Sequence, residues 1–280
     1  MFKPAPGQAG KNVLVKIAEH LDALRREGEL MAAAAGRAGL AAAVPSCPAW
    51  QVKDLLRHTG YVHRWAARHI TEGPAEVIDG PSEAEILSGG AADEDLLGWF
   101  RAGHAALVET LAGADPAVRC ATFMPAPTPL AFWTRRQAHE TAIHRADAEL
   151  ADGPADGSVP EYPPRFAADG IDELIMGFGQ RRKYQPSAGP DADAGLLRVI
   201  AADTGDAWSI KARQGFLQPR RETGAAATDG ADTGCTVSGP ASGLYLFLWN
   251  RADATAAGVT VTGDLTLLAS WQASVKIRWS

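Results

Sequence analysis

TRRQAHETAIHRADAE, residues 134–149, is the stretch that decides the fold prediction. Residues four apart on an α-helix lie about 40° apart around its axis, so Glu140 and His144 point the same way. His139 comes five residues before His144 and points elsewhere, so this is not the HExxH motif of zinc proteases, whose histidines are four apart. A carboxylate and an imidazole on one face can share a small target, and a divalent metal is the obvious candidate.

The surrounding residues predict a helix. Thr128 and Pro129 supply an N-cap and a first helical proline, residues 130–150 contain no glycine or proline, and Gly153 ends the pattern. One face is mostly polar and consists of Trp133, Gln137, Glu140, His144 and Asp147. If that face is buried, its polar groups must be paired, hydrated or ligated. The alternative is a solvated outer face, because Glu/His pairs at this spacing also occur on exposed helices.

Composition limits the class of protein. The chain has 280 residues, enough for two domains or one large one, and a formal net charge of −6, which argues against nucleic-acid binding. No apolar run approaches the roughly 18–20 residues of a membrane span. Cys47, Cys120 and Cys235 are scattered without CxxC spacing, which suits a reducing cytoplasm and gives neither a disulfide framework nor a thiolate metal site. We therefore expect a cytoplasmic protein that binds neither nucleic acid nor membrane.

Apolar periodicity predicts further helices at about residues 12–35, 50–70 and 94–112, with a long connection at 73–93 that holds one short helical turn. With the helix at 130–150, this is the pattern of a four-helix bundle, a fold that commonly holds metals in its core. A shorter fifth helix is predicted from Phe166 to Phe178.

Among the histidines that lie on predicted helices outside residues 130–150, two are candidate metal ligands. His58 lies on the apolar face of the second helix and His104 on that of the third, so both are predicted to face inward and either is a candidate ligand. Without further context, the favoured interpretation of His58 is a core histidine bonded to a neighbour's carbonyl or carboxylate. His63 falls off its helix's apolar face and is predicted to be exposed. Spacing alone leaves His58 and His104 open.

The amino-acid composition changes at Gln180. The stretch QRRKYQPSAGPDADAG, residues 180–195, mixes charge, proline and glycine like an interdomain linker. Strands are then predicted at 197–201 and 207–212 around a tight turn, and at 235–238 and 259–262. Helices are predicted at 240–249 and, capped by Asp264, at 265–271. We expect a helical domain over residues 1–183 and a small α+β domain over residues 184–280.

Three stretches together carry a family resemblance: HETAIHRADAE at 139–149, PAWQVKDLLRHTGYVHRWA at 48–66, and LYLFLWNRADATAAGVTVTGDLTLLASW at 244–271. They resemble the mycothiol-dependent maleylpyruvate isomerase family of actinobacteria. The resemblance covers nearly the whole chain. It implies an α+β two-domain protein, in which a DinB-like metal-binding four-helix bundle precedes a sterol-carrier-like domain.

The resemblance also implies a site. Its metal ligands, carried over by position, are His58, Glu140 and His144, which would act in catalysis through a zinc or other divalent ion. Two imidazoles and one carboxylate leave zinc with open coordination, where an entering thiol loses its proton. The implied cosubstrate is mycothiol. Its thiolate would add to an activated double bond and leave again in an isomerase, or stay attached to an electrophilic substrate in an S-transferase.

Other residues receive weaker predictions. Asp147 and Gln137 flank the ligand pair and are predicted to orient a ligand or the thiol. Three arginines near the metal helix are candidates for binding a carboxylate substrate, or are ordinary solvated charges: Arg135, Arg136 and Arg145. His139 is predicted to be a surface or packing residue. Two non-enzymatic alternatives remain: a metal- or ligand-binding module whose coordination is closed by a residue such as His104, and a metal-free helical protein.

Overall fold

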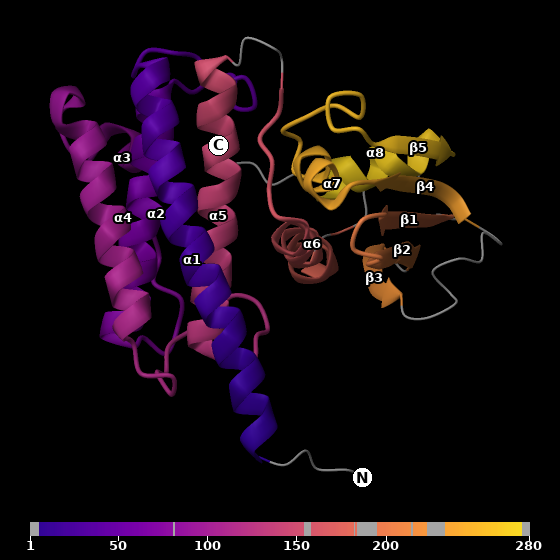
Figure 1. Cartoon of the computed structure of the whole chain (residues 1–280), viewed down its shortest axis with the longest axis horizontal. Helices are drawn as coiled ribbons and strands as arrows, with labels where there is room; N and C mark the ends of the chain where they lie inside the picture. The colour runs from indigo at the N-terminus through magenta and orange to yellow at the C-terminus, as the bar shows by residue number, and fades with distance from the viewer. Residues whose placement is uncertain are drawn as a thin grey trace. The chain divides into compact units, whose positions relative to one another are not determined.

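The computed structural model describes residues 6–80, 82–153, 158–181, 183, 195–213, 215–222 and 233–275. Contacts divide the chain into two compact units, Met1–Ala155 and Asp156–Trp279 (Figure 1). The division falls before the fifth helix, whereas the linker-like composition had predicted a boundary after residue 183. Residues 184–194, the centre of that predicted linker, lie outside the described residues.

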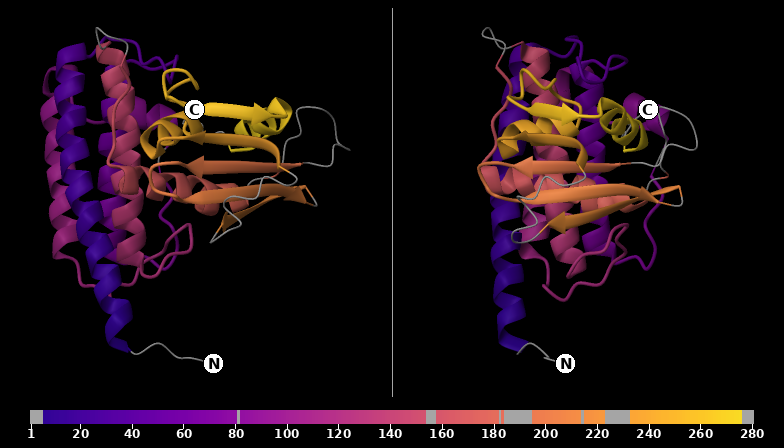
Figure 2. Two further views of the ribbon diagram at one scale, coloured as in Figure 1. Left: turned by 45° about the vertical axis from the view of Figure 1, so that its right-hand side comes forward. Right: turned by 90° about the vertical axis from the view of Figure 1, so that its right-hand side faces the viewer.

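The first unit is a bundle of four long helices, as predicted. These are α1 (Pro6–Ala38), α2 (Val52–Glu72), α4 (Leu96–Gly113) and α5 (Pro129–Asp152), with the short helices α3 (Glu83–Ser88) and η1 (Asp93–Asp95) between α2 and α4. Both α1 and α2 contact α4 and α5. Figure 2 shows the long helices side by side within this unit. The apolar faces meet in a core that includes Met31, Leu55, Leu56, Leu96 and Phe100.

The ends of α5 follow the sequence signals. The Thr128 hydroxyl accepts a hydrogen bond from the Ala131 amide at 3.1 Å, and Pro129 occupies the first helical turn. Gly153 adopts φ 71°, and its amide donates to the Glu149 carbonyl at 3.2 Å. Only glycine takes this left-handed conformation without steric cost, so the helix ends there. These caps fix where the polar face of α5 lies.

The second unit is a five-stranded sheet with helices. Its strands are β1 (Leu196–Ala201), β2 (Ala207–Arg213), β3 (Phe216–Glu222), β4 (Thr233–Gly239) and β5 (Thr260–Gly263), in the order β3-β2-β1-β4-β5. Its helices are α6 (Pro164–Asp172), α7 (Ala241–Leu248) and α8 (Leu265–Ser274), and α6 continues into a π-helical turn at Glu173–Phe178 and a 3-10 turn at Gly179–Arg181. The β1–β4 pair is parallel, and the other three pairs are antiparallel.

Most of this unit matches the sequence prediction. The β1–β2 hairpin forms as expected, with Ile200 opposite Ala207, and Asp264 caps α8 by accepting from the Thr266 amide at 2.9 Å. The sequence analysis missed β3, which contains Pro219. Proline cannot donate to a strand ladder, so it is tolerated here because β3 is the edge strand.

Two ion pairs with buried or largely buried members join elements of the second unit. The Asp172 carboxylate accepts from the Trp208 indole at 3.1 Å and from two guanidinium N–H groups of Arg221. Arg198, also buried, donates to Glu222 at 2.8 Å. Both carboxylates are therefore neutralised within the fold.

Among the described residues, no helix combines the length and the apolar character needed to cross a bilayer.

Candidate metal centre

Three side chains from two helices converge inside the bundle. His58 of α2 places Nε2 3.5 Å from Glu140 Oε1, and His144 places its own Nε2 3.2 Å from the same oxygen. One potential ligand atom from each residue lies within 4.8 Å of the others. The residues are 3, 3 and 1 % exposed, so the polar face of α5 is buried, and the solvated-face alternative is wrong.

Local sequence explains this convergence. Glu140 and His144 are one turn apart on α5, and His58 lies on the inward face of α2. The His58 ring packs between Trp50, at 5.0 Å between centroids, and His144, at 5.1 Å. Trp50 is held by the turn before α2, where the Val44 amide donates to its carbonyl. The turn and the helix thus set the orientation of His58 together.

Asp147 fixes the orientation of His144. Its carboxylate accepts from His144 Nδ1 at 2.8 Å and from the Ser46 hydroxyl. Burial lowers the pKa of His144, but the hydrogen bonds to Asp147 and Glu140 outweigh it and raise this pKa above its ordinary value. Because Nδ1 is used by Asp147, the Nε2 atom is the one presented to Glu140. This carboxylate–histidine pairing is the usual support of a metal-ligating histidine.

Arg136 plays a part that the sequence analysis did not predict. Its guanidinium donates to Glu140 Oε2 at 2.6 Å, and it is itself only 3 % exposed. Burial raises the pKa of Glu140, but the Arg136 charge and the hydrogen bonds from His144 and His58 hold that pKa well below its usual range. Glu140 is therefore an anion, with Oε2 on Arg136 and Oε1 facing the imidazoles. The i,i+4 spacing of Arg136 and Glu140 was the available signal.

The other two arginines differ from this one. Arg145 donates to Glu149 at 2.7 Å and to Glu27 of α1 at 3.0 Å, so it joins α5 to α1. Arg135 is half-buried on α5. A substrate-binding role for either stays a prediction.

Gln137 lies on the buried polar face of α5, one turn before Glu140. It is 1 % exposed, and neither its amide nitrogen nor its amide oxygen has a hydrogen-bond partner among the described residues. His139 is also buried, and its ring packs edge-on against His20 of α1 with 5.8 Å between centroids. Burial makes one of the two roles expected for His139, that of a surface residue, wrong, and the packing role stays a prediction.

The prediction that His63 is exposed is wrong. The residue is fully buried, and its Nε2 lies 2.9 Å from the Thr141 hydroxyl. The reason is that α4 packs against α2, and the His63 ring lies 5.5 Å from that of His104 on α4, a contact that the apolar face of α2 alone does not predict. Burial lowers the pKa of His63 well below its ordinary value. His63 is therefore held as a neutral imidazole.

His104 does face inward, but it has a different partner. Its Nε2 donates to the Leu24 carbonyl of α1 at 2.9 Å. A side chain in place of the Gly28 hydrogen would meet the His104 ring at 2.2 Å, so the ring packs directly on α1. Among the described residues, the group that gathers around Glu140 holds His58 and His144 and does not include His104.

The donor set fits a divalent transition metal. Two imidazole nitrogens approach one carboxylate oxygen, and nitrogen and oxygen donors in this ratio suit zinc and its neighbours in the periodic table. Asp147 and Arg136 hold two of the three donors in place. The ligand role of His58, Glu140 and His144 stays a prediction, because donor chemistry does not identify the ion.

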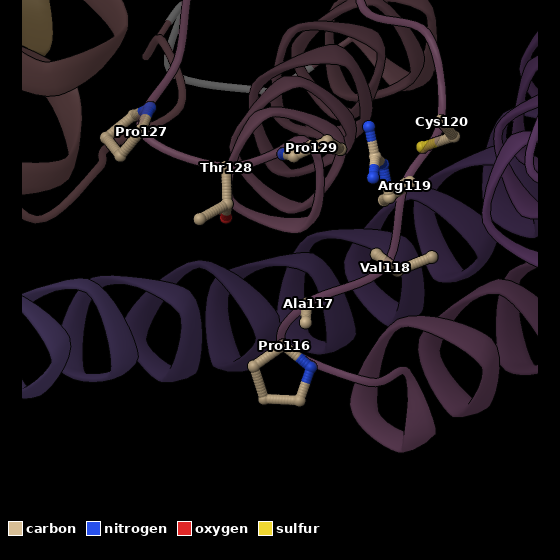
Figure 3. Close-up of a pocket in the computed structure, with 8 residues that line it drawn as sticks. All are labelled: Pro116, Ala117, Val118, Arg119, Cys120, Pro127, Thr128 and Pro129. Carbon is tan, nitrogen blue, oxygen red and sulfur yellow. The ribbon is translucent and has the colours of Figure 1, made fainter. Parts of the chain in front are cut away.

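A surface pocket of about 340 Å³ lies elsewhere in the first unit, at the start of α5 (Figure 3). Figure 3 shows Arg119, Cys120 and Pro129 among its lining residues, and none of the cluster residues lines it. Burial raises the pKa of the Cys120 thiol, so this sulfur is not activated as a thiolate.

Two family models match most of the chain. Residues 21–149 match the mycothiol maleylpyruvate isomerase N-terminal domain, and residues 165–270 match the C-terminal domain of the same family. A search of curated protein sequences found no match. Two crystal structures, of the mycothiol-dependent maleylpyruvate isomerase and of a histidine-to-alanine mutant of it, each match with TM-score 0.56 and 16 % identity, over 88 % of this chain and 92 % of theirs. At this identity the structural likeness establishes the fold.

Proposed function

Because the chain belongs to the mycothiol maleylpyruvate isomerase family, an enzyme family of isomerase type, we propose that it uses a divalent metal and the thiol mycothiol to isomerise a cis double bond. One observation carries the proposal: two buried imidazole nitrogens converge on one oxygen of a buried, ionised carboxylate. The metal would be held by His58, Glu140 and His144.

A bound zinc ion would lower the pKa of an incoming thiol, and so provide a thiolate nucleophile at neutral pH. Two of the chain's three thiols are poor substitutes, because burial raises the pKa of both Cys120 and Cys235. In this proposal the nucleophile is supplied by a small cosubstrate. Addition of its sulfur to an activated double bond leaves a single bond that rotates, and loss of the thiolate restores the double bond in the other geometry.

The protein residues do the positioning. Asp147 keeps the Nδ1–H of His144 occupied, so that Nε2 is available toward Glu140. Arg136 holds Oε2 of Glu140, so that Oε1 is available toward the imidazoles. His58, Glu140 and His144 are nearly inaccessible to solvent. This burial excludes water that would compete with sulfur, and it strengthens the electrostatic interactions at the site.

An S-transferase of the same chemistry would retain the sulfur in its product. The isomerase proposal is tested by incubating zinc-loaded protein with mycothiol and maleylpyruvate and following the formation of fumarylpyruvate by absorbance. We expect thiol-dependent turnover that disappears in Glu140→Gln.

A parallel incubation with mycothiol and a chlorodinitrobenzene electrophile tests the transferase. Thioether formation without isomerisation would favour the transferase. Zinc binding with neither reaction would favour a binding module and contradict the proposal.

A further inference from the structure

Gln137 is a buried amide that the fold does not satisfy. Both its donor nitrogen and its acceptor oxygen are inaccessible and lack a hydrogen-bond partner among the described residues. Burying an amide without partners costs free energy, and such groups in native proteins call for a specific explanation. A partner from outside the chain, bound in the functional state, is one such explanation.

The neighbouring polar groups of α5 are satisfied within the bundle. Glu140 accepts from Arg136, and the Thr141 hydroxyl pairs with His63. Gln137 precedes these two residues by three and four positions, so all three share one face of the helix, with about 5–6 Å between Cβ atoms of neighbours. The unpaired amide is therefore one helical turn from the carboxylate at the centre of the candidate metal cluster.

The charges near Gln137 favour a neutral ligand group. Glu140, one helical turn from Gln137, is an anion, and Arg136 is already engaged with it. A second carboxylate from a ligand would meet like charge there. A primary amide offers one acceptor and two donors, which match the N–H and C=O of another amide.

We infer that the side-chain amide of Gln137 binds the amide group of a cysteine-derived thiol whose sulfur faces the His58–Glu140–His144 cluster. In such a thiol the amide nitrogen and carbonyl are attached to the carbon next to the one that carries sulfur, a span that suits the separation of one helical turn between Gln137 and Glu140. The inference rests on the proposed function, because it assumes that a thiol enters this site. It assigns Gln137 as a positioning residue that selects acylated cysteinyl thiols over simple ones.

The test compares two thiols by calorimetry on the zinc-loaded full chain: N-acetylcysteinamide, which carries amides, and 1-propanethiol, which carries none. Gln137→Leu removes both polar atoms at similar size. We expect it to weaken binding of N-acetylcysteinamide about tenfold, the scale of one or two lost hydrogen bonds. Binding of 1-propanethiol, zinc content and the melting temperature of the thiol-free protein stay the same or rise.

Thr134→Val is the matched control. Thr134 is a buried polar residue of the same helix, but its hydroxyl donates to the Leu130 carbonyl at 2.7 Å. This variant should bind both thiols like the wild type. If Gln137→Leu weakens binding of both thiols equally, or of neither, the inference is wrong, and a trapped water becomes the better account of the amide. If zinc-loaded wild-type protein binds neither thiol, the proposed function fails as well.

Discussion

His58 and His63 lie five residues apart on α2, and both are buried, yet they stand in different chemical surroundings. His58 faces the carboxylate of Glu140 and the imidazole of His144, whereas His63 faces the hydroxyl of Thr141 and the ring of His104. Both clusters are buried, and each contains two histidines, His58 and His144 in one and His63 and His104 in the other. The difference is the presence of acids, so the carboxylates of α5 decide which cluster suits a cation.

The pKa values of His144 and His63 are shifted in opposite directions in the two clusters. Hydrogen bonds to Asp147 and Glu140 raise the pKa of His144 against the effect of burial, while His63, which has no such partner, has its pKa lowered well below normal by burial. A site that stabilises an imidazolium also stabilises a metal cation in its place. The charge of Glu140 also acts on His63, but it does not offset burial and the neighbouring His104, so the His63 cluster is expected to remain a neutral part of the core.

The largest effect is expected when a ligand of the acidic cluster is removed. His144→Ala or Glu140→Gln should abolish zinc retention, because each takes one of three donors from the candidate site. Zinc content of the purified variants, measured by mass spectrometry, checks this.

His139→Ala and His63→Phe are the matched controls, since both alter buried histidines outside the cluster and should retain zinc. Equal zinc content in all four variants would refute the ligand assignment. Loss of zinc in His63→Phe alone would move the site to the other cluster.

A smaller effect is expected from Arg136→Met. The change leaves the buried Glu140 without its guanidinium partner, and breaking a buried ion pair on one side typically costs about 3–5 kcal/mol. We expect denaturant unfolding of the metal-free variant to show a loss of this size at pH 7. At a fixed zinc concentration of 100 times the wild-type dissociation constant, the wild type should gain about 2.7 kcal/mol. The Arg136→Met variant should gain more at the same zinc concentration, because the cation replaces the lost positive charge.

Arg145→Met provides the comparison for this experiment. Its ion pairs with Glu149 and Glu27 lie outside the cluster, so any stability it loses should not depend on the presence of zinc. Stabilisation by zinc that is the same in both variants as in the wild type would show that Arg136 is not coupled to the metal.

Local sequence signals predicted the helices and part of the site. The caps Thr128 and Gly153 and the spacing of Glu140 and His144 act within one helix, so α5 and its polar face could be derived directly. The choice of His58 over His104 came from the family resemblance, since both face inward and spacing cannot distinguish them. In the structure the distinction arises from packing, because His104 is bonded to the Leu24 carbonyl.

The errors and omissions have tertiary causes. His63 is buried because α4 packs against α2, a contact that a one-helix periodicity does not reveal. The sequence analysis interpreted Arg136 as a candidate for binding a carboxylate substrate or as a solvated charge. It did not predict the ion pair with Glu140, because a buried arginine is rare and the pairing depends on the depth of Glu140. The strand β3 was missed because Pro219 and its charged neighbours argue against a strand, and only its position at the sheet edge makes them acceptable.

The smallest effect is expected in the neutral cluster. Thr141→Val keeps the shape of the side chain but removes the partner of His63 Nε2, leaving a buried nitrogen unsatisfied at a cost of about 1–2 kcal/mol. Denaturant unfolding should show this loss, with Thr134→Val as the control, because the Thr134 hydroxyl donates to the Leu130 carbonyl of its own helix. Zinc affinity should be unchanged in both variants, since no acid of the other cluster is touched. A fall in zinc affinity in Thr141→Val would mean that the two clusters act as one network, and the acids of α5 would no longer be sufficient to define the metal site.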